Sequence, residues 1–254
     1  MSTNDGIFGA SFVGHLIELR QRLLRIILLI CVLIIGLFPF ANTLYVLVAE
    51  PLISVLPPDT SMIATQVASP FLTPFKLSLV TALFLAMPYV LHQIWSFVAP
   101  GLYHHEQNLT RPILISSIIL FYLGTLFAYF VVFPLIFAFL TTAAPDGVAV
   151  MTDISHYLDF VLTLFFAFGL VFEVPVATVL LVLMGTTTTQ TLRQKRPYII
   201  VGAFVLGMLL TPPDVISQTL LAIPVWILFE LGVLAAGFVQ QRSRTIDHTS
   251  SSLN

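Results

Sequence analysis

Six apolar stretches divide the chain and constrain its fold more than any other feature. They run over about residues 23–40, 75–98, 113–140, 157–184, 198–210 and 215–238. All but the fifth have the roughly 18 or more residues that a helix needs to cross a membrane. The chain is 58% hydrophobic and only 9% charged, with a mean hydropathy of +1.01, which is too apolar for a soluble domain of 254 residues. Because a lipid-exposed backbone must satisfy its own hydrogen bonds, we predict an all-α polytopic membrane protein with six transmembrane helices.

The last two stretches predict a short helical hairpin. Residues 198–210 would form only about 20 Å of helix before Thr211-Pro212-Pro213-Asp214 turns the chain. A hairpin this short must thin the bilayer or leave a recess beside its longer neighbours. We therefore predict a concave bundle in which Thr211 and Gln218 lie below the outer membrane surface. The expected organisation is one membrane domain over residues 1–240 and a flexible tail over residues 241–254.

The charges of the connecting segments predict the orientation. Nine of the ten basic residues fall on one side of this layout, namely Arg20, Arg22, Arg25, Arg111, Arg193, Lys195, Arg196, Arg242 and Arg244. The opposite side holds Glu50, Asp59, Asp146, Asp153 and Asp214. The positive-inside rule then makes both termini cytoplasmic. No Arg-rich and Ser-rich transit segment precedes the first span, so we expect a multi-pass protein of a bacterial inner membrane.

Glu173 is the most unusual residue, because it lies well inside the apolar stretch 157–184. A carboxylate there is costly, so it should face protein or a wet cavity, be protonated, or pair with a partner. It is a functional candidate, although a neutral Glu that hydrogen-bonds a neighbouring helix as structural glue is an alternative. A lone membrane carboxylate also fits a proton- or cation-coupled small-solute transporter. Against that alternative, its neighbours on the same helix face are apolar: Phe166, Gly169, Leu170, Val176 and Ala177.

Signatures of enzyme chemistry are weak. No Gly-rich phosphate loop occurs. Adjacent His104 and His105 point in different directions on most backbones and lack a suitably spaced further ligand. Ser155, His156 and Asp159 match a hydrolase only in composition. We therefore expect no enzymatic activity, no metal, no cofactor and no nucleic-acid partner.

Glu18 and Glu106 are acidic residues at membrane entrances on the basic side. One explanation of these two acidic residues needs no ligand: each forms a local ion pair, with Arg22 or Arg111. The functional alternative is a receptor for an arginine-bearing ligand, because a carboxylate makes two-point contacts with Arg more readily than with Lys.

Seven sequence blocks carry a resemblance to a known family. They are HLIELR (15–20), MIATQVASPF (62–71), SFVAPGLYHHE (96–106), FAYFVVFPL (127–135), FGLVFEVPVA (168–177), RPY (196–198) and GMLLTPPDVISQTLLAIP (207–224). In these blocks the chain resembles TatC, the multispanning receptor of the twin-arginine protein translocase, most closely the proteobacterial type. The resemblance covers about residues 12–238.

The resemblance implies roles for particular residues. Recognition of twin-arginine signal peptides is implied for Glu18, Arg20, Phe97, Leu102, Tyr103 and Glu106. Contact with TatB- and TatA-type single-span subunits is implied for Glu173, Met208, Thr211 and Gln218, and importance in the outer loops for Pro51 and Asp214. The family also implies a multimeric membrane complex that exports folded precursors using the proton motive force. One departure is that His104, His105, Gln107 and Asn108 surround Glu106, where related loops often carry several basic residues.

Overall fold

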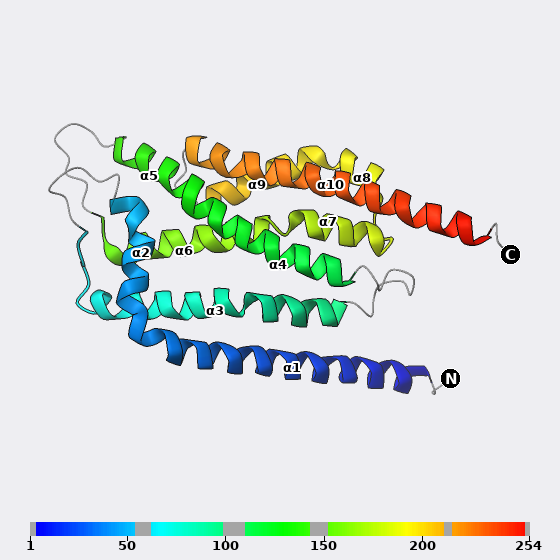
Figure 1. Ribbon diagram of the computed structural model, residues 1–254, viewed down its shortest axis with the longest axis horizontal. Helices are drawn as coiled ribbons and strands as arrows, with labels where there is room; N and C mark the ends of the chain where they lie inside the picture. Colours follow the sequence, from blue (N-terminus) through cyan, green and yellow to red (C-terminus); the bar gives the residue numbers. More distant parts are fainter. Residues whose placement is uncertain (1–3, 54–61, 99–109, 143–151, 211–214, 252–254) are drawn as a thin grey trace.

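The computed structural model describes residues 4–53, 62–98, 110–142, 152–210 and 215–251. Within these ranges the chain is helical apart from short connections, and its only extended pairing is one isolated bridge between Ile63 and Asp153. The prediction of an all-α fold is confirmed. Long helices lie side by side, and the two termini lie at the same end of the bundle (Figure 1). We call this the terminal end and the other the far end.

The first span is one long helix, α1 (Asn4–Leu37), that ends at a proline. Pro39 cannot donate an N–H to the helix, and the chain tightens there into the 3₁₀ turn η1 (Phe38–Phe40). Helix α2 (Ala41–Ile53) follows and runs across the far end of the bundle (Figure 1). Helix α3 (Ser69–Val98) then returns beside α1 and begins six residues before the predicted span. Pro70 is compatible with this start because a first-turn residue needs no helical N–H bond.

The third span is a helix with a π-helical turn in it. It comprises α4 (Thr110–Phe127), the π turn η4 (Ala128–Val132) and α5 (Phe133–Thr142). Pro134 lies just after the π turn and leaves the carbonyl four residues earlier without its usual donor. The wider π turn accommodates the missing hydrogen bond, so the helix continues beyond it.

The fourth span differs from the single helix predicted over residues 157–184. The structure has two helices, α6 (Ile154–Val171) and α7 (Val174–Leu183), with Glu173 between them. The cause is Pro175, which cannot donate a hydrogen bond to the carbonyl of Val171. The Glu173 N–H instead bonds the Leu170 carbonyl at 3.0 Å, a tighter i to i−3 turn.

The last region contains a short helix and a long one. Helix α8 (Thr189–Gln194) leads into α9 (Arg196–Leu210) and then α10 (Val215–Ser251). Helix α9 is short, as predicted, with 15 residues. Helix α10 is not short: it has 37 residues and extends past the predicted end at residue 238. No proline or glycine follows residue 238 to interrupt it. The hairpin begins short of the far end that α2, α5 and α6 reach (Figure 1). The division into a domain over 1–240 and a flexible tail over 241–254 stays a prediction.

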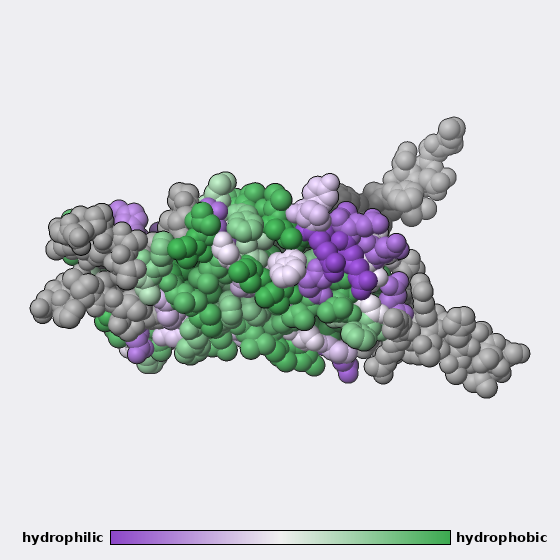
Figure 2. Space-filling model, turned by 90° about the horizontal axis from the view of Figure 1, so that it is seen from above, coloured by the Kyte–Doolittle hydropathy of each residue, from purple (hydrophilic) through white to green (hydrophobic). Residues whose placement is uncertain are grey.

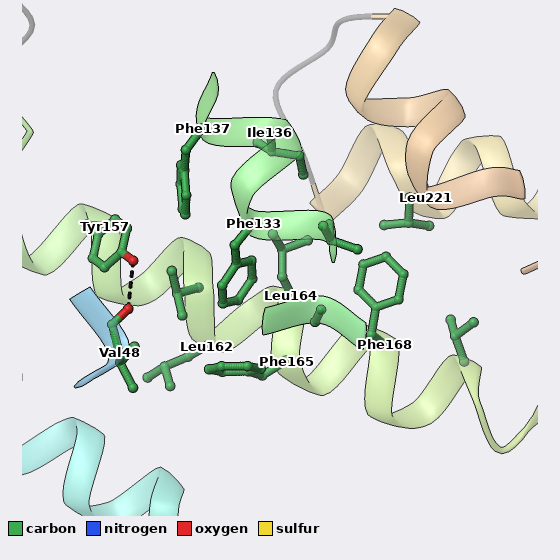
Figure 3. Packing of buried hydrophobic residues seen from close by; sticks show 14 of the residues in the cluster. Val48, Phe133, Ile136, Phe137, Tyr157, Leu162, Leu164, Phe165, Phe168 and Leu221 are labelled. Carbon is green, nitrogen blue, oxygen red and sulfur yellow. Dashed lines mark hydrogen bonds between the residues drawn. The ribbon is translucent and has the colours of Figure 1, made fainter. Parts of the chain in front are cut away.

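Helix α6 is the centre of the packing. Nine of its 18 residues are buried. It packs against α3, α4 and α9, and its buried residues share a hydrophobic cluster with residues of α2. Phe133 from α5 packs against Phe165 with the rings tilted and their centroids 4.9 Å apart, and the Tyr157 hydroxyl donates to the Val48 carbonyl of α2 at 2.8 Å (Figure 3). At the α4/α6 crossing, a Cβ on Gly124 would lie 2.5 Å from the Phe168 carbonyl oxygen, so only glycine permits this approach.

The surface fits a membrane protein. Among the described residues, five helical segments are long and apolar enough to cross a bilayer, and α9 is a shorter apolar helix. A hydrophobic surface covers the middle of the molecule, and hydrophilic residues gather near one end (Figure 2). These helices and this surface support the prediction of a polytopic membrane protein.

Candidate functional site

Glu173 lies within the membrane segment and is held by a serine from another helix. Ser117 of α4 is fully buried, and its hydroxyl donates to Glu173 Oε2 at 2.6 Å. The other carboxyl oxygen, Oε1, is buried and has no hydrogen-bond partner among the described residues. A buried acceptor without a donor is costly, so a proton or a further donor would stabilise this oxygen. The predicted hydrogen bond to a neighbouring helix is therefore observed for one oxygen, and a functional role of Glu173 stays a prediction.

Glu18 lies at the terminal end, where Arg22 holds it. Arg22 Nε donates to Glu18 Oε1 at 3.0 Å, one helical turn along α1. The same guanidinium reaches α3, where Nη1 donates to the Gln93 side-chain oxygen at 2.8 Å. It also lies 3.5 Å from the carbonyls of Gln93 and Ser96, near the end of α3. The predicted local pairing of Glu18 with Arg22 is confirmed, and Arg22 fixes this carboxylate relative to α3.

The remaining residues of the predicted signal-binding set lie near this end or outside the described part. Arg20 is exposed and Phe97 is half-buried in the last turn of α3. Leu102, Tyr103 and Glu106 lie outside the described residues, as do His104 and His105. Because α3 ends at Val98, the segment that contains Glu106 starts within one turn of Ser96.

Two of the predicted partner-binding residues, Met208 and Gln218, lie near the ends of α9 and α10 that the last turn joins. Met208 is 54% exposed on α9, and Gln218 is half-buried on α10. A Cβ on Gly207 would lie 3.3 Å from Gln218 Cα, so the two helices pack closely beside Met208. Thr211 and Asp214 lie outside the described residues, and Pro51 belongs to the last turn of α2. Glu173 lies on a different pair of helices, so the predicted set forms no single described cluster.

The ion pair between α9 and α10 was not predicted from the sequence. Glu230 of α10 lies within a predicted span and contacts Arg196 of α9, whose Nη2 donates to Oε2 at 2.5 Å. Arg196 Nε also lies 2.5 Å from Oε1. Glu230 inside the sixth predicted span, with Arg196 just before the fifth, was the available signal. The pair fastens the start of α9 to α10.

Sequence analysis also missed a junction at the far end. Asp153 caps α6, with Oδ1 accepting the N–H groups of Ser155 at 2.8 Å and His156 at 3.1 Å. Its Oδ2 accepts the Thr65 hydroxyl at 2.6 Å and the Thr65 N–H at 2.8 Å. The Thr65 hydroxyl, then the surrounding N–H groups, hold the pKa of Asp153 well below its usual range. An Asp directly before an apolar helical run was the signal for this cap.

Comparisons with known proteins show the family. A family model described as Sec-independent protein translocase protein (TatC) matches residues 14–224. The chain belongs to the TatC family. It is 59% identical over 230 residues to the TatC of Azotobacter chroococcum mcd 1, covering 91% of this chain and 90% of the relative. It is 58% identical over 232 residues to that of Escherichia coli K12, again covering 91% of this chain and 90% of the relative.

A solved TatC structure has the same architecture. The crystal structure of the twin-arginine translocase receptor TatC superposes with a TM-score of 0.78 at 36% identity, covering 89% of this chain and 99% of that chain. The resemblance noted in the sequence, including its proteobacterial type, is therefore confirmed. TatC is a receptor subunit of a protein translocase, and the expectation that the chain is no enzyme is confirmed by its family.

Proposed function

We propose that this translocase subunit binds twin-arginine signal peptides at the terminal end, which faces the cytoplasm of a bacterial inner membrane. Glu18 and Glu106 would receive the two arginines, with Arg20, Phe97, Leu102 and Tyr103 around them. The observation that carries the proposal is the contact of Arg22 with both Glu18 and the end of α3. Arg22 thereby holds Glu18 beside the last turns of α3, and the segment that contains Glu106 follows α3 in the sequence.

The chemistry of the two carboxylates supports arginine as the ligand. A guanidinium can make two parallel contacts with a carboxylate, whereas a lysine ammonium acts as a point charge. Arg22 already donates twice to Glu18, with Nη2 at 2.5 Å and Nε at 3.0 Å from a single oxygen, Oε1. A second arginine therefore enters a site that is arranged around guanidinium contacts.

The orientation rests on charge. Described basic residues at the terminal end include Arg20, Arg25, Arg193 and Lys195, whereas Asp153 lies at the far end with its α6 cap. An excess of Arg and Lys on one side places that side in the cytoplasm. Signal peptides of precursors that await export are present there.

The packing supports a docking platform. Phe133 and Phe168 are fully buried in the centre of the bundle, which leaves no passage for a folded protein through these helices (Figure 3). Export must therefore involve further subunits. We propose that TatB- and TatA-type single-span helices contact Glu173 and also the last hairpin, at Met208, Thr211 and Gln218, in a multimeric complex driven by the proton motive force.

Glu173 supports this role through its Oε1, which would accept a hydrogen bond from a polar side chain of a partner helix. Such a bond is favourable in hydrocarbon, where no water competes. As the apolar part of the signal moves along the bundle, this contact would be made or released. The rival function, a proton- or cation-coupled solute transporter, predicts further polar residues along a route through the bundle.

Export by cells that lack their own family member tests the proposal. The chain should restore export of a folded twin-arginine reporter, whereas Glu18→Ala and Glu106→Ala should lower export strongly. Arg25→Gln serves as a control for charge at the same end. Restored export with both carboxylates removed would contradict the proposed site. Vesicles that contain only this protein should show no proton-dependent solute uptake, and such uptake would support the rival function.

A further inference from the structure

A pocket of about 580 Å³ opens between α8 and α10 at the terminal end. Helix α8 contributes polar residues to it, and α10 contributes mainly apolar ones. The lining residues are Thr189, Gln190, Arg193, Val233, Leu234, Gly237, Phe238 and Gln240. In Figure 2 the hydrophilic surface at this end directly borders the hydrophobic surface of the membrane part. The pocket therefore lies where headgroups meet acyl chains.

The pocket has a positive charge without a compensating acid. Arg193 is exposed and forms no ion pair with any described residue, and none of the lining residues is acidic. Glu230 lies about one turn before Val233 on α10, but Arg196 holds both of its oxygens within 2.5 Å. Exposed Lys195 adds a second cation near α8. An anion is the ligand that this charge favours.

An apolar stripe leads away from the pocket along α10. Phe238 is 73% exposed and Leu234 49%, and the stripe continues with Leu231 at 52% and Ile227 at 45%. Their spacing of four, three and four residues places them on one helix face. The cation and the stripe together match the two parts of a phospholipid, a phosphate and an acyl chain.

Gly237 keeps the pocket open. A Cβ added at this position would meet no atom within 4 Å. The space above the glycine is therefore free, and a larger side chain there would fill the pocket without displacing a neighbour. A larger side chain at Gly237 can therefore block the pocket without disturbing the packing of α10.

We propose that the α8/α10 pocket binds one anionic phospholipid. Its phosphate contacts Arg193 and the polar groups of Thr189 and Gln190, and one acyl chain lies along Leu234 and Phe238. Arginine binds phosphate through charge-assisted hydrogen bonds, and basic pockets at the cytoplasmic side of helical bundles suit anionic headgroups. This site is separate from Glu18 and Glu173, so it stands independently of the signal-binding proposal.

Native mass spectrometry of the purified full chain tests the site. The chain is titrated with phosphatidylglycerol or with phosphatidylcholine, and the affinity of the first bound lipid is measured. We expect about fivefold tighter binding of phosphatidylglycerol, and Arg193→Gln should remove this preference. Gly237→Leu should weaken binding of phosphatidylglycerol at least about fivefold while thermal stability is kept.

Two control variants separate the pocket from general effects. Arg25→Gln removes an exposed cation from α1 at the same end, and Gly202→Leu adds the same side chain on α9, where a Cβ also meets nothing within 4 Å. Both should bind phosphatidylglycerol like the wild type. Equal affinity for the two lipids, or a loss in Arg25→Gln as large as in Arg193→Gln, would overturn the proposal. So would wild-type binding by Gly237→Leu, or displacement of the lipid by an equal concentration of inorganic phosphate.

Discussion

Ser117 and Glu173 come from different transmembrane segments, and the Ser117 hydroxyl donates to Glu173 Oε2 at 2.6 Å. The break between α6 and α7 places the Glu173 backbone opposite α4 at this level, and Ser117 is fully buried there. The bond satisfies one carboxyl oxygen, while Oε1 has no donor among the described residues. This relationship connects the kink at Pro175 to the proposed contact with partner helices.

Removing the Ser117 hydroxyl should destabilise the protein. Ser117→Ala leaves a buried oxygen of Glu173 without a donor, which costs about 1–3 kcal/mol. The matched control is Ser116→Ala, because the Ser116 hydroxyl is exposed and bonds only the Pro112 carbonyl of its own helix. Thermal unfolding of the two purified variants compares them, and equal unfolding temperatures would show that the Ser117 bond contributes nothing.

Substitutions of Glu173 should separate its acceptor role from mere packing. Glu173→Ala removes both oxygens, and export of a twin-arginine reporter should fall by about tenfold or more, equivalent to about 1.4 kcal/mol. Glu173→Gln keeps an oxygen for Ser117 and should retain more export than Glu173→Ala. Full export by Glu173→Ala with unchanged co-purification of partner subunits would rule out a role at this position.

Arg22 should act as a positioning residue for signal binding. Arg22→Gln removes the contacts to Glu18 and Gln93, and binding of a twin-arginine peptide should weaken by about tenfold, since a charged hydrogen bond contributes about 1.5–3 kcal/mol. Arg22→Lys keeps the charge and should be intermediate. Arg25→Gln should bind like the wild type. If Arg22→Gln binds normally, the placement of Glu18 does not depend on Arg22.

Asp153 predicts a loss of stability in acid. Its folded-state pKa lies below the ordinary value of about 3.9, so the unfolded chain binds the proton first as pH falls. The stabilisation from this carboxylate is fully present above about pH 4 and is lost as pH falls towards the folded pKa. Thermal unfolding between pH 7 and pH 3 should therefore show a steeper acid decline in the wild type than in Asp153→Asn or Thr65→Val. Parallel curves for all three proteins would contradict the assigned network.

The long apolar stretches predicted the helices well, because a membrane span needs both length and an apolar surface. Periodicity alone could not show that Pro175 and Pro134 would reshape two spans, since a proline in a span can be absorbed as a kink, a π turn or a break. Glu173 was identified from its cost in hydrocarbon, but Ser117 was not, because its partner lies 56 positions away and only packing brings the two together. The Arg196–Glu230 pair was missed for the same reason. Cap residues such as Asp153 are local and could have been predicted.

If the proposed site binds the signal, this chain distinguishes arginine from lysine in a signal peptide. The most direct measurement is equilibrium binding of the purified chain to a twin-arginine peptide and to its twin-lysine counterpart, with Glu18→Ala and Glu106→Ala alongside. We predict that the twin-arginine peptide binds at least about tenfold tighter, and that each variant loses most of this preference. Equal binding of the two peptides by the wild type, or an undiminished preference in both variants, would contradict the account.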